Sequence, residues 1–178
     1  MIKKWLFGLA FILLLTNLLM ARQKKAIVKE VVVETQDAAY FGVQAAKLTD
    51  LIIKNNNEFQ EKLRLSFELP KSLESSLARA RIILTAYKKD GRVLGKHIWP
   101  SVKSGKIEEI PGNILRVTFD VNSEFEGADK YSLTLIKDDV PIEISCRECV
   151  EFVKGTCGRG NVKSVNCGAD GSCSFSCK

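Results

Sequence analysis

The stretch Leu63-Arg64-Leu65-Ser66-Phe67-Glu68-Leu69-Pro70 decides the fold, because its apolar and polar residues alternate strictly. A period of two places the apolar side chains on one face of a β-strand and the polar ones on the other. The next two apolar runs, Ala78–Tyr87 and Arg92–Trp99, flank the turn Lys88-Lys89-Asp90-Gly91, whose Asp-Gly pair is a strong hairpin signal. The sequence therefore predicts antiparallel β-structure from residue 63 onward.

Further strands follow at close intervals. The expected strands are Ile107–Ile110, Ile114–Val121, Tyr131–Ile136 and Pro141–Ser145, the last two flanking a turn at Lys137-Asp138-Asp139. About seven short strands in roughly 85 residues are typical of a two-sheet sandwich. We therefore expect a mainly β fold, with an immunoglobulin-like β-sandwich domain over residues 63–145. The chain lacks an intersheet cysteine pair with a tryptophan between its members, so this expectation concerns architecture and not an antibody-type family.

The residues before the sandwich carry a different pattern. Over Ile27–Leu63, apolar residues recur at spacings of three and four. This spacing predicts an N-terminal helix from Gln36 to about Lys62, which either packs onto the sandwich or forms a coiled-coil stalk. We assign residues 22–62 as a helical lead or stalk, although Ala26–Thr35 equally fits an edge strand.

All the cysteines lie in a C-terminal tail over residues 146–178; they are Cys146, Cys149, Cys157, Cys167, Cys173 and Cys177. An even number of cysteines in a short segment with few apolar residues predicts a disulfide-stapled tail, because covalent loop closure must supply the order that a core cannot. The spacing does not choose a connectivity. Two other interpretations are a redox pair at Cys146-Arg147-Glu148-Cys149 and a zinc site, for which a second close cysteine pair is missing.

The first residues resemble an export signal. Met1-Ile2-Lys3-Lys4 is cationic, and the sixteen residues Trp5–Met20 that follow are predominantly apolar. We expect residues 1–21 to be a signal peptide, with a retained membrane anchor as the alternative. The run is shorter than the roughly twenty residues that a membrane-spanning helix needs. Both interpretations place the rest of the chain outside the cytoplasm, where disulfides persist: secreted, periplasmic or at the cell surface.

Few residues are candidates for catalysis. His97 is the only histidine in the sequence, and no serine-nucleophile elbow, phosphate-binding loop, dinucleotide fingerprint or metal-binding helix motif is present. Asp138 and Asp139 fit a turn between two strands better than an acid or calcium site. We therefore expect a protein without enzyme activity, cofactor or metal.

Charge is unevenly distributed along the sandwich. The segment Tyr87–Lys106 contains six cationic residues and one acidic residue, whereas Ile107–Lys130 contains six acidic and two cationic residues. A surface of this kind can steer a charged partner. The expected partner-binding residues are Lys88, Lys89, Arg92 and Lys96, with Trp99 as an aromatic anchor. The alternative is an ordinary solvated strand surface.

Together these patterns predict an exported, non-enzymatic binding or assembly module of the cell envelope or surface. Its partner would be a protein or an anionic polysaccharide or other envelope polymer, and it could form homo-oligomers. Nucleic acid is not expected because of the exported location, and membrane contact is expected only through residues 1–21. One alternative is a membrane-anchored structural subunit of a surface filament or complex, and a second is a thiol–disulfide oxidoreductase that uses Cys146 and Cys149.

Overall fold

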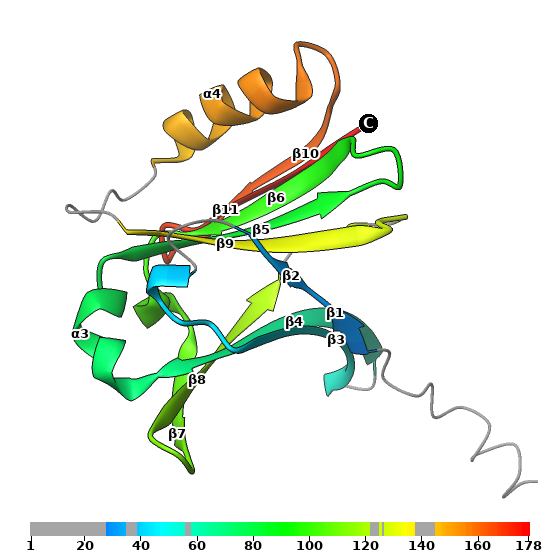
Figure 1. The fold of residues 1–178 in the computed structure, drawn as a ribbon. Coiled ribbons are helices and arrows are strands. Elements are labelled where there is room, and N and C mark those ends of the chain that lie inside the picture. Colours follow the sequence, from blue (N-terminus) through cyan, green and yellow to red (C-terminus); the bar gives the residue numbers. More distant parts are fainter. Residues whose placement is uncertain (1–27, 35–38, 56–57, 122–124, 126, 138–144) are drawn as a thin grey trace, which may run out of the picture.

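The computed structural model describes residues 28–34, 39–55, 58–121, 125, 127–137 and 145–178, with the backbone alone at 52–55 and 58–61. Within these residues the strands form two sheets (Figure 1). Sheet A has five strands in the order β1-β3-β4-β8-β7, and sheet B has six in the order β10-β11-β6-β5-β9-β2. Strands β2 and β9 run parallel, and the other paired strands run antiparallel.

The elements have the following bounds. The strands of sheet A are β1 (Val28–Glu30), β3 (Ala45–Asn55), β4 (Glu58–Pro70), β7 (Lys106–Ile110) and β8 (Ile114–Val121). The strands of sheet B are β2 (Val32–Val33), β5 (Ala80–Tyr87), β6 (Val93–Trp99), β9 (Lys130–Lys137), β10 (Val162–Cys167) and β11 (Cys173–Cys177). The described helical elements are η1 (Lys71–Leu73), α3 (Glu74–Leu77), η2 (Val102–Ser104) and α4 (Cys146–Cys157).

The main core lies between the two sheets. Along β4, Leu65, Phe67 and Leu69 are buried and alternate with half-buried polar residues. They share one apolar cluster with Ile82 and Leu84 of β5 on the facing sheet. The structure therefore confirms the mainly β fold with two sheets that the period-two pattern predicted.

The helix expected over residues 36–62 is wrong where the structure describes this segment. Strands β3 and β4 form a long hairpin instead, in which Asn55 pairs with Glu58 and Leu48 pairs with Leu65. In β3, the buried Ala46 and Leu48 alternate with the exposed Lys47, so the segment also satisfies a period of two. The run of asparagines that begins at Asn55 favours a turn over a helix, and this local signal outweighs the three-and-four spacing.

Several other predicted elements can be compared with the structure. The edge strand that Ala26–Thr35 allowed is confirmed, since β1 and β2 lie at one edge of sheet A and of sheet B respectively. The strand order does not establish an immunoglobulin-like topology. The strand expected at Pro141–Ser145 lies outside the described residues except for Ser145, and residues 1–21 lie outside them entirely. No helix among the described residues is long and apolar enough to cross a membrane.

The tail forms a third layer that packs on the outer face of sheet B. Helix α4 lies across β10, β11 and β6 on the side away from sheet A (Figure 1). Its inward residues Cys149 and Val153 are fully buried against Phe175 of β11 and Ile98 of β6. The tail therefore has a small apolar core of its own, in addition to the disulfides that the sequence predicted.

Strand β11 continues sheet B beyond β6. Ser176 pairs with Gly95, and Cys173 pairs with Ile98. Gly95 is required at this position because a Cβ there would overlap the carbonyl oxygen of Phe175 and lie 2.8 Å from the ring of Phe125. The missing side chain of one glycine therefore lets the tail approach the sandwich.

Gly95→Ala tests this close approach. We expect it to lower the free energy of unfolding by roughly 2 kcal/mol, because an added methyl group would force β11 away from β6. Chemical denaturation followed by tryptophan fluorescence measures the change. The matched control is Gly155→Ala in α4, where a Cβ meets nothing within 4 Å and alanine favours the helix. Equal effects from both substitutions would contradict the close-approach argument.

Candidate functional site

The turn between β5 and β6 presents three of the predicted binding residues. The backbone N–H of Lys88 donates to the carbonyl of Arg92 at 2.8 Å, and Gly91 takes a φ of 84° that suits glycine. The carboxylate of Asp90 accepts the backbone N–H of Arg92 at 3.0 Å. Lys89 and Arg92 are exposed and Lys88 is half-buried. The turn therefore holds these cations at the tip of the hairpin.

The tail adds two cations at the same end of sheet B. Ser176 pairs with Gly95, so Lys178, two residues later, lies beside the start of β6 and close to Arg92. The backbone N–H of Lys178 donates to the carbonyl of Asn161 at 2.7 Å, which brings the loop containing Arg159 to this end. Figure 1 shows the β5–β6 turn and the C-terminus at one end of the sheet.

We call Lys88, Lys89, Arg92, Arg159 and Lys178 the basic end. None of these five side chains forms an ion pair with another residue that the structure describes. Among the described residues, Asp90 and Asp129 lie near the hairpin, and both accept backbone N–H groups of its turn: Asp90 that of Arg92, and Asp129 that of Lys89 at 2.9 Å. Lys178 Nζ donates to the backbone carbonyl of Gly160 at 3.1 Å, a contact that does not neutralise its charge. The positive charge of these side chains is therefore available to a partner.

Four acidic residues of sheet A, in contrast, form ion pairs. Within the described part of the chain, Asp120 pairs with Arg64 at 3.0 Å, Glu68 with Arg116 at 2.7 Å, Glu109 with Lys71 at 2.6 Å and Glu108 with Lys106 at 2.5 Å. Three acids of the stretch Ile107–Lys130, namely Glu108, Glu109 and Asp120, are thus paired locally. The five cations of the basic end have no such ion pair with the described residues.

The structure separates Lys96 and Trp99 from the hairpin tip. Lys96 is half-buried, and its Nζ lies 5.3 Å from the ring centroid of Phe152 on α4. Burial lowers the pKa of Lys96 from its usual value of 10.5. Trp99 is only 2% exposed, so the anchor role that we expected does not fit its position. Its ring packs at 4.6 Å from Phe119 of the facing sheet, which makes it a core residue.

Arg159 and Lys178 were not among the predicted binding residues, although each is a cation within two residues of a cysteine. Their role depends on the disulfide between Cys157 and Cys177, which joins the end of α4 to the end of β11. The spacing of the cysteines did not specify this pairing. No local signal could therefore have placed these two cations next to the β5–β6 turn.

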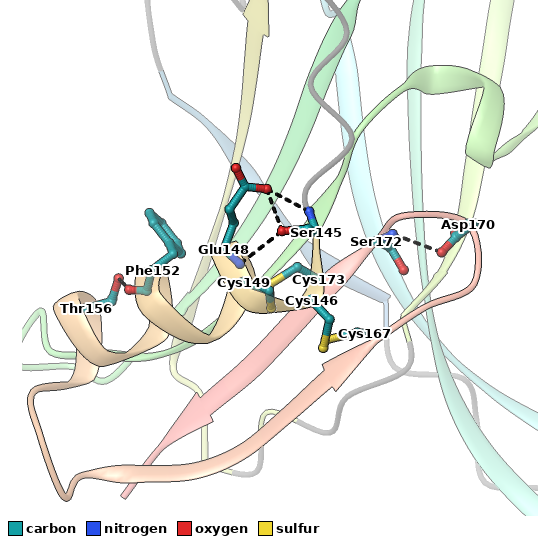
Figure 2. Close-up of a disulfide and its surroundings, with 10 residues drawn as sticks. All are labelled: Ser145, Cys146, Glu148, Cys149, Phe152, Thr156, Cys167, Asp170, Ser172 and Cys173. Carbon is teal, nitrogen blue, oxygen red and sulfur yellow. Dashed lines mark hydrogen bonds between the residues drawn. A yellow bond between two sulfur atoms is a disulfide. The ribbon is translucent and has the colours of Figure 1, made fainter.

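The cysteines Cys146 and Cys149 are bonded to different partners (Figure 2). Cys146 pairs with Cys167, and Cys149 pairs with Cys173, so the two do not form the mutual disulfide that a redox pair requires. Both lie in α4, which begins with a capping box: the Ser145 hydroxyl accepts the backbone N–H of Glu148, and the Glu148 carboxylate accepts that of Ser145. All six cysteines are in disulfides, which leaves no thiolate for zinc.

The single histidine is a core residue with unusual electrostatics. His97 is 1% exposed and stacks on Trp99 with ring centroids 4.0 Å apart. Neither ring nitrogen has a hydrogen-bond partner among the described residues. Burial lowers the pKa of His97 from 6.5 to about 4, against the opposing attraction of Asp170. A general base needs a substrate proton within reach, and the ring is enclosed, so its position favours a structural role.

A groove of about 480 Å³ is a further candidate site. Arg64 and Asp120 line it, as do the hydroxyls of Ser66 and Thr118, which are 3.3 Å apart. Arg64 and Asp120 form an ion pair, and the two hydroxyls form a hydrogen bond with each other. The residues that line the groove include no nucleophile with an adjacent base. Among the described residues there is also no cluster of three or more His, Cys, Asp or Glu side chains that could hold a metal.

The lowered pKa of His97 predicts a pH-dependent stability. Between 6.5 and about 4, the unfolded chain takes up a proton that the folded chain excludes, so the free energy of unfolding should fall as the pH drops through this window. The expected total loss is roughly 3 kcal/mol. Urea denaturation of the unmodified protein and of His97→Phe, which keeps an aromatic ring but cannot titrate, measures the loss. The same slope in both proteins would assign the effect to other groups.

Comparison with family models, with curated protein sequences and with solved structures finds no match to this chain. The functional argument therefore rests on the geometry and charge of the described residues.

Proposed function

We propose that this chain is an exported, non-enzymatic binding module that contacts an anionic partner through the basic end. One observation carries the proposal: two distant parts of the sequence place cations at the same end of sheet B. These cations are Lys88, Lys89 and Arg92 of the hairpin and Arg159 and Lys178 of the tail. Cations that are held together without an ion-pair partner among the described residues attract anions over distances of about 10 Å at moderate salt.

The three disulfides support the exported location. Bonds of this kind persist in oxidising compartments and are rare in the cytosol. They also support a rigid binding surface, because the Cys157–Cys177 bridge fixes the loop of Arg159 relative to Lys178. A rigid set of charges loses less conformational entropy on binding than a flexible one.

The alternatives receive less support from the described residues. Head-to-tail assembly through opposite charges needs an exposed acidic face, whereas four acids of sheet A form ion pairs with neighbouring cations; they are Glu68, Glu108, Glu109 and Asp120. Thiol–disulfide exchange through Cys146 and Cys149 needs a solvent-accessible pair bonded to each other, whereas Cys149 is fully buried and bonded to Cys173.

Neutralisation of the hairpin tests the proposal. The triple substitution Lys88→Gln, Lys89→Gln and Arg92→Gln should weaken binding to polyphosphate, used as a model anionic polymer, by roughly tenfold or more. Titration calorimetry at two salt concentrations should also show a weaker salt dependence for the variant.

The matched control removes the same charge far from the basic end. Arg79, Lys103 and Arg147 are exposed and lie at the opposite end of the molecule, at the start of β5, in η2 and in α4. Replacing these three by glutamine should change the affinity for polyphosphate less than twofold, since they lie beyond a Debye length from the basic end. An equal loss of affinity for polyphosphate in both triple variants would mean that only net charge matters, and it would contradict a localised site.

A further inference from the structure

The described start of the chain points toward one end of the sandwich. Strand β1 runs antiparallel to β3, with Glu30 opposite Lys47 and Val28 opposite Thr49. Going backward along the chain from Val28 therefore follows β3 forward, toward Asn55. The N-terminal end of β1 is therefore directed toward the end where β3 turns into β4.

This end is also the end that carries the β5–β6 turn. Strand β8 runs toward the start of β4 and finishes at Val121, opposite Leu63 in the middle of β4, and the chain then continues to β9. Strand β9 starts at Lys130, which pairs with Tyr87, the residue before the hairpin turn. Figure 1 shows β1 and the β5–β6 turn on the same side of the molecule.

Covalent geometry limits how far the sandwich can lie from the apolar run Trp5–Met20. Seven residues separate Met20 from Val28. A peptide of this length spans at most about 25 Å in any conformation. Three of the seven are cationic, namely Arg22, Lys24 and Lys25. If the apolar run is in a bilayer, the end of the sandwich that receives the chain must face that bilayer at close range.

We propose that residues 1–21 are retained as a membrane anchor and that the anionic partner of the basic end is the lipid surface of that membrane, so that the sandwich rests with its β5–β6 turn on anionic headgroups. This inference rests on the proposed function, since it names the partner of the same five cations. Phosphate headgroups bind both residue types, lysine as a point charge and arginine through two parallel N–H groups.

The tether favours a membrane over a soluble polymer. A short connection makes contact with the bilayer intramolecular, so even weak attraction by each cation acts at a high effective concentration. Clustered cations beside a membrane-inserted segment bind anionic lipids additively, and the attraction decays within a Debye length of the surface. The basic end satisfies both conditions at once.

Hydrogen exchange of the full chain reconstituted into vesicles tests the inference. One sample contains phosphatidylcholine alone, and in the other phosphatidylglycerol replaces a third of it. We expect amides at 86–94 and 158–162 to exchange several-fold more slowly in the anionic vesicles, while amides at 71–77, at the opposite end, are unchanged. The hairpin triple variant should lose this protection, and the control triple variant with Arg79, Lys103 and Arg147 replaced should keep it.

A third sample adds polyphosphate to the protein in phosphatidylcholine vesicles. Protection of the basic end by polyphosphate but not by phosphatidylglycerol would overturn the membrane inference and leave the proposed function standing. No protection by either anion would overturn both. Protection in phosphatidylcholine alone that the hairpin variant retains would show that charge does not drive the contact, and this result also contradicts the inference.

Discussion

The pairing of β11 with β6 is the constraint on which the rest of the structure depends. It adds the tail to sheet B as two further strands, and it sets the surface on which α4 packs. The close approach at Gly95 and the burial of Phe175 make the contact specific. The disulfides lie entirely within the tail, so they stabilise the tail itself, while strand pairing and apolar contacts attach it to the sandwich.

The same constraint creates the candidate binding surface. An antiparallel strand at this register carries Lys178 to the level of the β5–β6 turn, and the Cys157–Cys177 bridge brings the loop of Arg159 with it. Four acids of sheet A form ion pairs with neighbouring cations, whereas the five cations of the basic end form none with the described residues. The domain thus presents charge from a turn and a loop that strand pairing and a disulfide hold in place, which costs less conformational entropy on binding than a flexible loop.

Local patterns predicted the elements whose signals are local. The alternation at Leu63–Pro70 and the Asp-Gly turn at Asp90-Gly91 correspond to β4 and the β5–β6 hairpin. The helix expected at 36–62 failed because the apolar residues there fit two periods, and only pairing with the rest of sheet A selects between them. Helix α4 was not predicted, although Ser145-x-x-Glu148 is a capping-box pattern that indicates the start of a helix. The closely spaced cysteines favoured a prediction of irregular loops instead.

Long-range contacts explain what the sequence could not reveal about the site. β6 is covered on both faces, by sheet A and by α4, so both Ile98 and Trp99 are buried and the alternation that separates inside from outside is lost. A tryptophan in such a strand cannot be distinguished from an exposed anchor by its neighbours. In the same way, the proximity of Lys178 to Arg92 follows from strand pairing and not from spacing in the sequence.

The most direct test of this account is a map of the disulfides in the protein purified from its native host, by mass spectrometry of peptides before and after reduction. The account predicts no free thiol and the pairs Cys146–Cys167, Cys149–Cys173 and Cys157–Cys177. A different partner for Cys157 or Cys177, or a free thiol at either position, would contradict it, because the loop of Arg159 would then no longer be fixed beside Lys178.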